Sequence, residues 1–298
     1  MGTSSDVIVE QPLLKGGEKV FRKKRWRISS IVKWAIILLF AALFAILFWW
    51  MIDTALLSNR HVFDYPPDLW PRVPEWSNFA KAIAQTNFLR YIANSIGVGF
   101  LIVIGQLITA SLAAYAIARV PFRGRKIAYG VILSTLMIPT QITFIPLFLI
   151  MKQLNWIDSY QALIVPFLGS AFATFWLIQA FRQVPQVILD AAQIDGANHF
   201  WILWRIVVPL SKSSLLSVAF LNFVFHYNDL FWPLVVTQSD VMRTVPVGLS
   251  YLIASDGAGT AWNVLMASAI IAVIPAVVLF LFGQRYLVQS VSHSGLKE

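Results

Sequence analysis

Six long apolar runs, separated by polar segments, constrain the fold of this sequence more than any other feature. An apolar run of about 18 residues or more is long enough to cross a bilayer as a helix. Because the bilayer core holds no water, only helices and closed barrels can pair all their backbone groups there. These runs are too long and too continuous for barrel strands, so we expect an all-α integral membrane protein with six transmembrane helices. The expected spans are 31–52, 90–118, 128–150, 160–182, 213–237 and 262–284.

Composition supports the membrane assignment and excludes several other classes. Hydrophobic residues make up 58% of the chain and charged residues 12%, whereas about 25% of a soluble domain is charged. The net charge of +9 is carried between the apolar runs, which indicates contact with membrane lipid rather than with nucleic acid. The sequence has no cysteine, so disulfides, thiolate metal sites and cysteine nucleophiles are excluded.

The distribution of basic residues predicts the orientation. If both termini and residues 119–127 and 182–212 lie on one side, the opposite side carries only six of the 23 Lys and Arg residues. These six are Arg60, Arg72, Lys81, Arg90, Lys152 and Arg243. Because basic segments are retained in the cytoplasm, we expect both termini to be cytoplasmic.

The segment between the fourth and fifth spans has the pattern of two short helices joined by a glycine. Pro185 suits the first turn of a helix, Gly196 suits a left-handed C-terminal position, and Asn198 suits the cap of a second helix. Apolar residues of the first helix share one face at helical spacing; they are Val187, Ile188, Ala191 and Ile194. Such an element is either a docking surface for a cytoplasmic partner or an elbow on the membrane surface, and periodicity alone favours neither.

The spacing within this segment resembles the EAA loop of binding-protein-dependent ABC importer permeases. That loop reads Glu-Ala-Ala, three residues, Gly, nine residues, and then Ile-x-Leu-Pro. Here Asp190-Ala191-Ala192 is followed after three residues by Gly196, and after nine more by Ile206-Val207-Val208-Pro209. The two departures, Asp190 for Glu and Val208 for Leu, are conservative in charge or shape.

Other stretches narrow the resemblance to carbohydrate permeases. Ala113–Arg119 with Phe122–Arg125 is similar to the end of their second span, Tyr227–Leu234 to their fifth span, and Gln284–Val288 to their C-terminal tail. The resemblance covers about residues 75–298 and is closest to the MalG-type subunits of sugar importers.

The resemblance implies a permease subunit rather than an enzyme, and it implies the partners. In such importers a dimer of ABC ATPase subunits docks on the EAA loops. A second homologous permease, usually a different chain, completes the path for a sugar or oligosaccharide, which an extracytoplasmic solute-binding protein delivers. The sequence has no Gly-rich phosphate loop, so we expect no cofactor on this chain, with ATP and Mg²⁺ on the ATPase. The expected location is the inner membrane of a bacterium or archaeon.

These expectations divide the chain into five parts. Residues 1–30 form a cytoplasmic tail, 31–52 an uncleaved anchor, 53–88 an extracytoplasmic loop, 89–285 the permease domain and 286–298 a second cytoplasmic tail.

The resemblance places the ATPase-docking role on the EAA segment. The expected docking residues are Ile188, Asp190, Ala191, Ala192, Asp195, Gly196, Ala197, Phe200 and Pro209. Asn228 and Asp229 lie within the expected fifth span, where an ionisable group usually faces a cavity or a partner, and they are candidates for the solute path. A structural carboxylate near the outer interface is the favoured alternative for Asp229. Arg243–Asp256 resembles the loop that probes the binding protein, or is a plain connector, and no metal site is expected.

Three other functions remain open at this point. One is an importer permease for a phosphorylated polyol or another small solute. An ion-coupled secondary transporter would show more intramembrane acidic groups and an inverted repeat, and neither is evident. A membrane-embedded enzyme would need a catalytic constellation such as His-Glu-x-x-His, and the sequence contains none.

Overall fold

The computed structural model describes residues 22–67, 70–84, 87–254 and 261–295. All regular secondary structure in this part of the chain is helical. Contacts divide the chain into two compact units, Met1–Trp50 and Met51–Glu298. The described residues hold four segments long and apolar enough to cross a membrane, or up to six if each of two bent helix pairs is one span. The all-α class is thus confirmed.

The first unit contains most of α1 (Arg22–Leu56), of which Ser30–Leu56 is a candidate span. The side chains from Ser30 to Phe48 are exposed, and a helix that is apolar on all sides suits a lipid environment. α1 contains the expected anchor 31–52, but it starts earlier, because Arg and Lys are good helix formers. Residues 1–21 of the expected tail lie outside the described residues.

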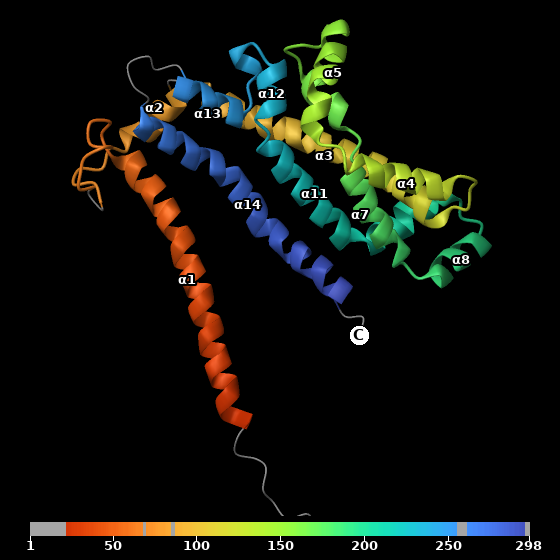
Figure 1. The fold of residues 1–298 in the computed structure, drawn as a ribbon. Coiled ribbons are helices and arrows are strands. Elements are labelled where there is room, and N and C mark those ends of the chain that lie inside the picture. The colour runs from red at the N-terminus through yellow and green to blue at the C-terminus, as the bar shows by residue number, and fades with distance from the viewer. Residues whose placement is uncertain (1–21, 68–69, 85–86, 255–260, 296–298) are drawn as a thin grey trace, which may run out of the picture. The chain divides into compact units, whose positions relative to one another are not determined.

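The second unit is built around α3 (Phe88–Arg119), which packs against α7 (Ala171–Arg182) and α11 (Lys212–Tyr227). α11 also packs against α14 (Trp262–Gly295), and Figure 1 shows this order of helices. Small side chains on α3 allow close approach of its neighbours. Buried residues between α3, α7 and α11 include Ala110, Ala114, Leu177, Phe181 and Val218.

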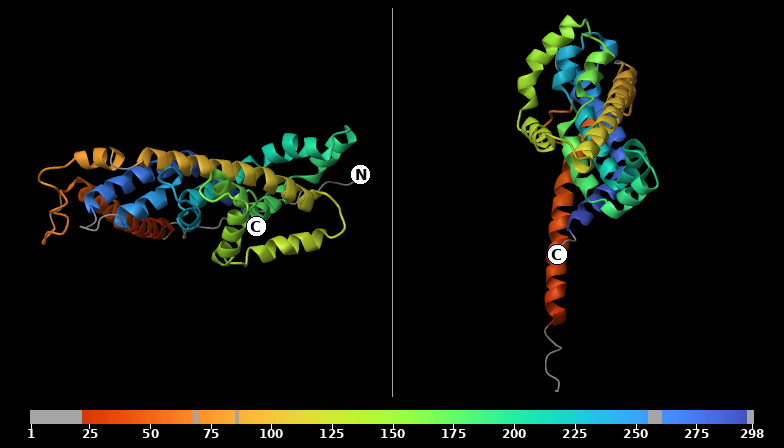
Figure 2. Two further views of the ribbon diagram at one scale, coloured as in Figure 1. Left: turned by 90° about the horizontal axis from the view of Figure 1, so that it is seen from above. Right: turned by 90° about the vertical axis from the view of Figure 1, so that its right-hand side faces the viewer.

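The expected third span is broken. In place of one helix over 128–150 the chain forms α4 (Arg125–Thr135) and α5 (Thr140–Gln153), which meet at 97°. Both views of Figure 2 show this corner in yellow to green. Pro139 lies at the N-cap of α5, and because the residue before a proline disfavours helical angles, the helix stops before it.

The expected fourth span is continuous in direction but not in helix type. Its parts are α6 (Tyr160–Ile164), the 3₁₀ turn η1 (Val165–Phe167) and α7. The Ser170 side chain then caps α7 by accepting a hydrogen bond from the Ala173 N–H at 3.1 Å. The segment Tyr160–Arg182 as a whole is a candidate span, as expected.

The expected fifth span, 213–237, is wrong in its second half. α11 ends at Tyr227, and a separate short helix, α12 (Phe231–Val236), follows. Hydropathy does not reveal this break because the residues on both sides of it are apolar. The expected sixth span, 262–284, is helical throughout, but α14 runs on beyond it into the expected C-terminal tail.

The loop expected over 53–88 contains regular structure. α2 (Ser77–Ala84) lies within it, and the buried side chain of Asn78 donates hydrogen bonds to the carbonyls of Ala55 at 3.0 Å and Leu57 at 2.9 Å. These are carbonyls at the end of α1, which have no partner within the helix. The connection after α12 is likewise structured, with a 3₁₀ turn, η3 (Asp240–Met242), and α13 (Val245–Ala254).

Candidate functional site: the docking segment

The segment expected to dock a partner, residues 185–209, folds as two short helices around a glycine and is called the docking segment. α8 (Gln186–Ile194) is followed by Gly196 with φ +83° and by α9 (His199–Ile202). The Asn198 Oδ1 atom accepts a hydrogen bond from the Trp201 N–H at 2.8 Å and so caps α9. The helix–glycine–helix prediction is confirmed. Pro185 stands one residue earlier than expected, at the N-cap of α8.

One face of α8 presents a row of apolar side chains to the exterior. Val187 is 78%, Ile188 41% and Ile194 86% exposed, and Ala191 on the same face is also exposed. We call these four residues the α8 ridge. On the opposite face Leu189 is buried in the core.

Ala192 departs from the sequence-based expectation. It was expected to be a docking residue, but it is only 8% exposed and packs in the same core as Leu189 and Phe181. Its small size therefore serves the approach of α8 to its own chain. Ala197 is half-buried against this core.

A pocket of about 600 Å³ opens where α8 meets α9. Its lining is mainly apolar, with Asp195 and Asn198 as its polar members. The lining residues are Ile188, Ala191, Ala192, Asp195, Gly196, Ala197, Asn198, Trp201 and Ile206. Six of the nine expected docking residues therefore surround one cavity.

The remaining expected docking residues lie close to this pocket but do not line it. Asp190 is exposed on α8 and accepts a hydrogen bond from the Gln186 Nε2 atom at 2.8 Å. Phe200 is 66% exposed, and its ring packs edge-on against the Trp204 ring with centroids 6.2 Å apart. Pro209 is exposed in α10 (Val208–Leu210), after a π-helical turn over Leu203–Val207.

The C-terminal end of α3 fixes the start of the docking segment. Arg119 donates from Nε to the Phe181 carbonyl at 2.9 Å and from a terminal nitrogen to the Val184 carbonyl. Its other terminal nitrogen donates to Gln186 Oε1 at 2.9 Å. The Phe181 carbonyl, in the last turn of α7, also accepts from the Val184 N–H at 3.3 Å, whereas Val184 follows α7 and its carbonyl has no helical partner. Arg119 therefore closes the end of α7 and ties it to the start of α8.

Tyr115, one turn before Arg119, fixes the second helix. Its hydroxyl lies 3.0 Å from Nδ1 of His199, and the two rings meet edge-on with centroids 5.9 Å apart. Sequence reasoning missed both anchoring residues. The available signal was their spacing, since residues four apart share a helix face and both lie in the stretch that resembles the end of the second permease span.

The two solute-path candidates lie in the break between α11 and α12. Asn228 Nδ2 donates to the Val224 carbonyl at 2.8 Å, at the end of α11. Asp229 Oδ1 accepts hydrogen bonds from the N–H groups of Phe231 at 3.1 Å and Trp232 at 3.5 Å, at the start of α12. Both side chains thus have helix-terminating contacts, which favours the structural alternative for Asp229. Among the described residues, no group of three or more His, Asp or Glu side chains is arranged to hold a metal ion.

Comparison with known proteins identifies the family. The sequence pattern of the binding-protein-dependent transport system inner membrane component matches residues 106–293, which is more than half of the chain. The chain belongs to this family. It is therefore an inner membrane component of a transport system and a permease, not an enzyme. The matched region contains the whole docking segment, and the resemblance found in the sequence is confirmed.

Curated relatives in this family are permease proteins of solute importers. The chain is 35% identical over 246 residues to the sn-glycerol-3-phosphate transport system permease protein UgpE of Yersinia pestis, covering 80% of this chain and 88% of that one. It is 34% identical over 207 residues to the arabinooligosaccharides transport system permease protein AraQ of Halalkalibacterium halodurans, covering 70% and 74%.

A solved structure has the same fold. A chain of a bacterial ABC transporter involved in the import of the acidic polysaccharide alginate matches with a TM-score of 0.79 and 23% identity. The match covers 90% of this chain and 99% of that one.

Proposed function

We propose that this permease is one of two membrane subunits of an ATP-driven importer, and that its docking segment binds an ABC ATPase dimer on the cytoplasmic side. The single observation that carries this proposal is the exposed α8 ridge beside the pocket at Gly196. The orientation predicted from basic residues, with both termini cytoplasmic, places this surface where an ATPase can reach it.

The α8 ridge has the chemistry of a protein contact. Fully burying one Val or Ile side chain contributes about 1.5–3 kcal/mol, so Val187, Ile188 and Ile194 together offer several kcal/mol to a partner that covers them. Asp195 lines the adjoining pocket, and its exposed carboxylate suits a basic side chain of the ATPase.

The same surface suits transmission of a conformational change. Reversing a two-state bias from 1:99 to 99:1 takes about 5.5 kcal/mol. In the proposed importer, closure of the ATPase dimer on ATP supplies this difference, and the docking segment passes it to the membrane helices through α3. The chain itself holds no nucleotide in this scheme.

The proposed solute is a sugar or oligosaccharide delivered by an extracytoplasmic binding protein. The AraQ relatives are named as permease proteins of an arabinooligosaccharides transport system. The alginate transporter of the same fold was also solved in complex with a periplasmic protein that holds an alginate pentasaccharide. A phosphorylated polyol is the second candidate, because the UgpE relatives at 35% identity belong to an sn-glycerol-3-phosphate system. Uptake of radiolabelled arabinooligosaccharide and glycerol-3-phosphate by cells expressing the complete importer separates the two.

A matched pair of glycine variants tests the docking role. Gly196 and Gly124 both have positive φ, of 83° and 87°, and a Cβ at either position would meet nothing within 4 Å. Gly196→Glu and Gly124→Glu therefore carry similar backbone strain, but only the first places a carboxylate in the pocket. Gly196→Glu is expected to abolish solute-stimulated ATP hydrolysis by the assembled complex, and Gly124→Glu to retain it. Solute-stimulated ATP hydrolysis at the wild-type rate in Gly196→Glu would remove the docking assignment.

A further inference from the structure

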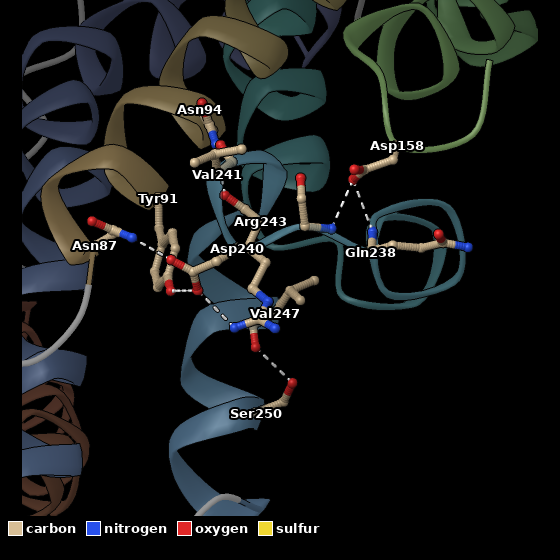
Figure 3. A network of polar contacts seen from close by, with 11 residues as sticks. Asn87, Tyr91, Asn94, Asp158, Gln238, Asp240, Val241, Arg243, Val247 and Ser250 are labelled. Atoms are coloured by element: carbon tan, nitrogen blue, oxygen red, sulfur yellow. Dashed lines mark hydrogen bonds and ion pairs between the residues drawn. The ribbon is translucent and has the colours of Figure 1, made fainter.

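The N-terminal end of α3 is fastened to residues 238–245, which we call the 238–245 loop. Asp240 is the centre of this contact (Figure 3). Its carboxylate accepts hydrogen bonds from the Asn87 amide and from the Tyr91 hydroxyl, the latter at 2.5 Å, and it pairs with the Arg243 guanidinium at 2.7 Å. One carboxylate thus joins the start of α3 to the loop.

Backbone groups of the loop are held by α3 as well. The Asn94 Nδ2 atom donates to the carbonyls of Val241 at 2.9 Å and Arg243 at 2.8 Å, and Figure 3 shows Asn94 beside Val241. The Ser95 hydroxyl accepts from the Val245 N–H at 2.8 Å. Asn94 and Ser95 are 4% and 2% exposed, so water does not compete for these bonds. We call the contacts made by Asn87, Tyr91, Asn94 and Ser95 the loop clamp.

The other end of α3 holds the docking segment, through Tyr115 and Arg119. Between these two attachments α3 is one helix of 32 residues, about 48 Å long at 1.5 Å per residue. No proline interrupts it. A continuous α-helix with a packed surface is a rigid element, and rigid elements carry coupling between distant sites.

The direct chain connection between the docking segment and the loop is not rigid in this way. The helical stretch His199–Leu210 meets α11 at a bend of 81° near Ser211. A second interruption separates the end of α11 at Tyr227 from the start of α12 at Phe231. These two breaks interrupt the helical path along that connection, whereas α3 is a single helix from the loop clamp to Arg119.

We propose that α3 couples the docking segment to the 238–245 loop, with the loop clamp keeping that loop and α3 together through the transport cycle. This inference rests on the proposed function, in which the docking segment binds the ATPase, and on the predicted orientation, in which Arg243 and its loop lie on the opposite side of the membrane, where the binding protein acts. A signal from the loaded binding protein then reaches the ATPase through Tyr91 and its neighbours, along α3, to Arg119.

A pair of tyrosine variants gives the first test in the assembled importer. Tyr91→Phe removes the hydroxyl that binds Asp240. The matched control Tyr227→Phe removes a buried hydroxyl that donates to the Ala272 carbonyl at 2.7 Å, between α11 and α14. We expect Tyr91→Phe to lower the maximal stimulation of ATP hydrolysis by loaded binding protein several-fold, with basal hydrolysis unchanged and with Tyr227→Phe close to wild type.

Two results of this experiment would overturn the proposal. One is equal stimulation in Tyr91→Phe and Tyr227→Phe. The other is a higher half-saturating concentration of binding protein with the maximal rate intact, which would make the loop a contact for that protein and nothing more. If wild-type complex shows no solute-stimulated hydrolysis at all, the proposed function itself fails and this inference fails with it.

The absence of cysteine from the sequence permits a second, independent test. Asn87→Cys and Asp240→Cys together remove the Asp240 carboxylate and its contacts with Asn87, Tyr91 and Arg243. A short bifunctional thiol-reactive reagent can then join α3 to the loop covalently when the partner subunits are cysteine-free. We expect weakened stimulation in the uncross-linked double variant and recovery to the wild-type level after cross-linking. Inhibition by the cross-link would mean that α3 and the loop separate during transport, which contradicts the proposal.

Discussion

The guanidinium carbon of Arg243 lies 3.8 Å from the centre of the Tyr251 ring, while the same guanidinium pairs with Asp240. Arg243 thus joins η3 to the face of α13. A cation over an aromatic ring contributes about 0.5–1 kcal/mol at partly exposed sites. Tyr251→Leu should therefore lower the melting temperature of the purified permease by a few degrees, and Tyr251→Phe, which keeps the ring face, should not. Equal losses in both variants would assign the effect to the hydroxyl group.

Close packing of Tyr91 against α13 gives a second prediction. A Cβ on Gly248 would lie 2.3 Å from the Tyr91 Cδ2 atom, so Gly248→Ala must displace the ring that reaches Asp240. Overpacking of this kind costs about 1–3 kcal/mol. Gly97→Ala on α3 is the control, because a Cβ there meets nothing within 4 Å and alanine favours the helix. Thermal unfolding should show a loss for the first variant and no loss for the second.

Protonation of Asp240 should loosen the loop clamp. The hydrogen bond from Tyr91 holds the pKa of Asp240 below its ordinary value of 3.8, with further help from Asn87 and Arg243. Because the folded pKa is below the unfolded one, the contribution of this carboxylate is complete above about pH 4 and is lost as the pH falls through the folded pKa. The difference in melting temperature between wild type and Asp240→Asn should be constant from pH 7 to about pH 5 and shrink below pH 4. A difference that persists unchanged to pH 3 would contradict this account.

Arg119 is predicted to be essential for the order of the docking segment. Arg119→Met would leave the Val184 carbonyl unpaired and the Phe181 carbonyl with only the Val184 N–H, and an unpaired buried polar group costs about 1–3 kcal/mol. Amide hydrogen exchange of residues 185–198 should accelerate in this variant. The control is Arg123→Met, a change at an exposed position just beyond α3, which should leave exchange in the docking segment unaltered.

Substitutions on the two faces of α8 should affect partner binding and folding separately. Ile194 is 86% exposed and Leu189 is buried on the opposite face of the same helix. Ile194→Asp should retain the melting temperature of the isolated permease but weaken its co-purification with the ATPase at least tenfold. Leu189→Asp should instead unfold the segment. Normal ATPase recovery with Ile194→Asp would show that the ridge faces something else.

Local signals account for the parts of the structure that the sequence predicted well. Gly196 predicts a left-handed residue and Asn198 a helix cap, and each residue has that role in the structure through contacts within a few positions of the sequence. The continuous helix over 90–118 was also predictable, because its long apolar run contains no proline that would end it.

Long-range contacts account for the parts that were missed. Arg119 donates hydrogen bonds to carbonyls at the end of α7, more than sixty positions away in sequence. No pattern near Arg119 predicts these partners. The break at Asn228 escaped notice for a different reason: a hydropathy window averages over two helices and the capping carboxylate of Asp229 between them. Ala192 was expected to dock a partner and is instead packed in the core, because the small size that suits a partner also suits the core of its own chain.

The 97° corner between α4 and α5 has a consequence for assembly. No side chain of α4 is buried within this chain, and α5 buries only Met151. Backbone that leaves the helical path at membrane depth is tolerated only beside protein or a water-filled cavity. Within this corner the amides of Leu136, Met137 and Ile138 are paired, and the Pro139 carbonyl accepts from the Ile142 N–H. The helical ladder is nevertheless interrupted there, and α4 and α5 bury little against their own chain. We therefore expect this flank of the subunit to be completed by a neighbouring polypeptide or by the aqueous channel of the finished transporter.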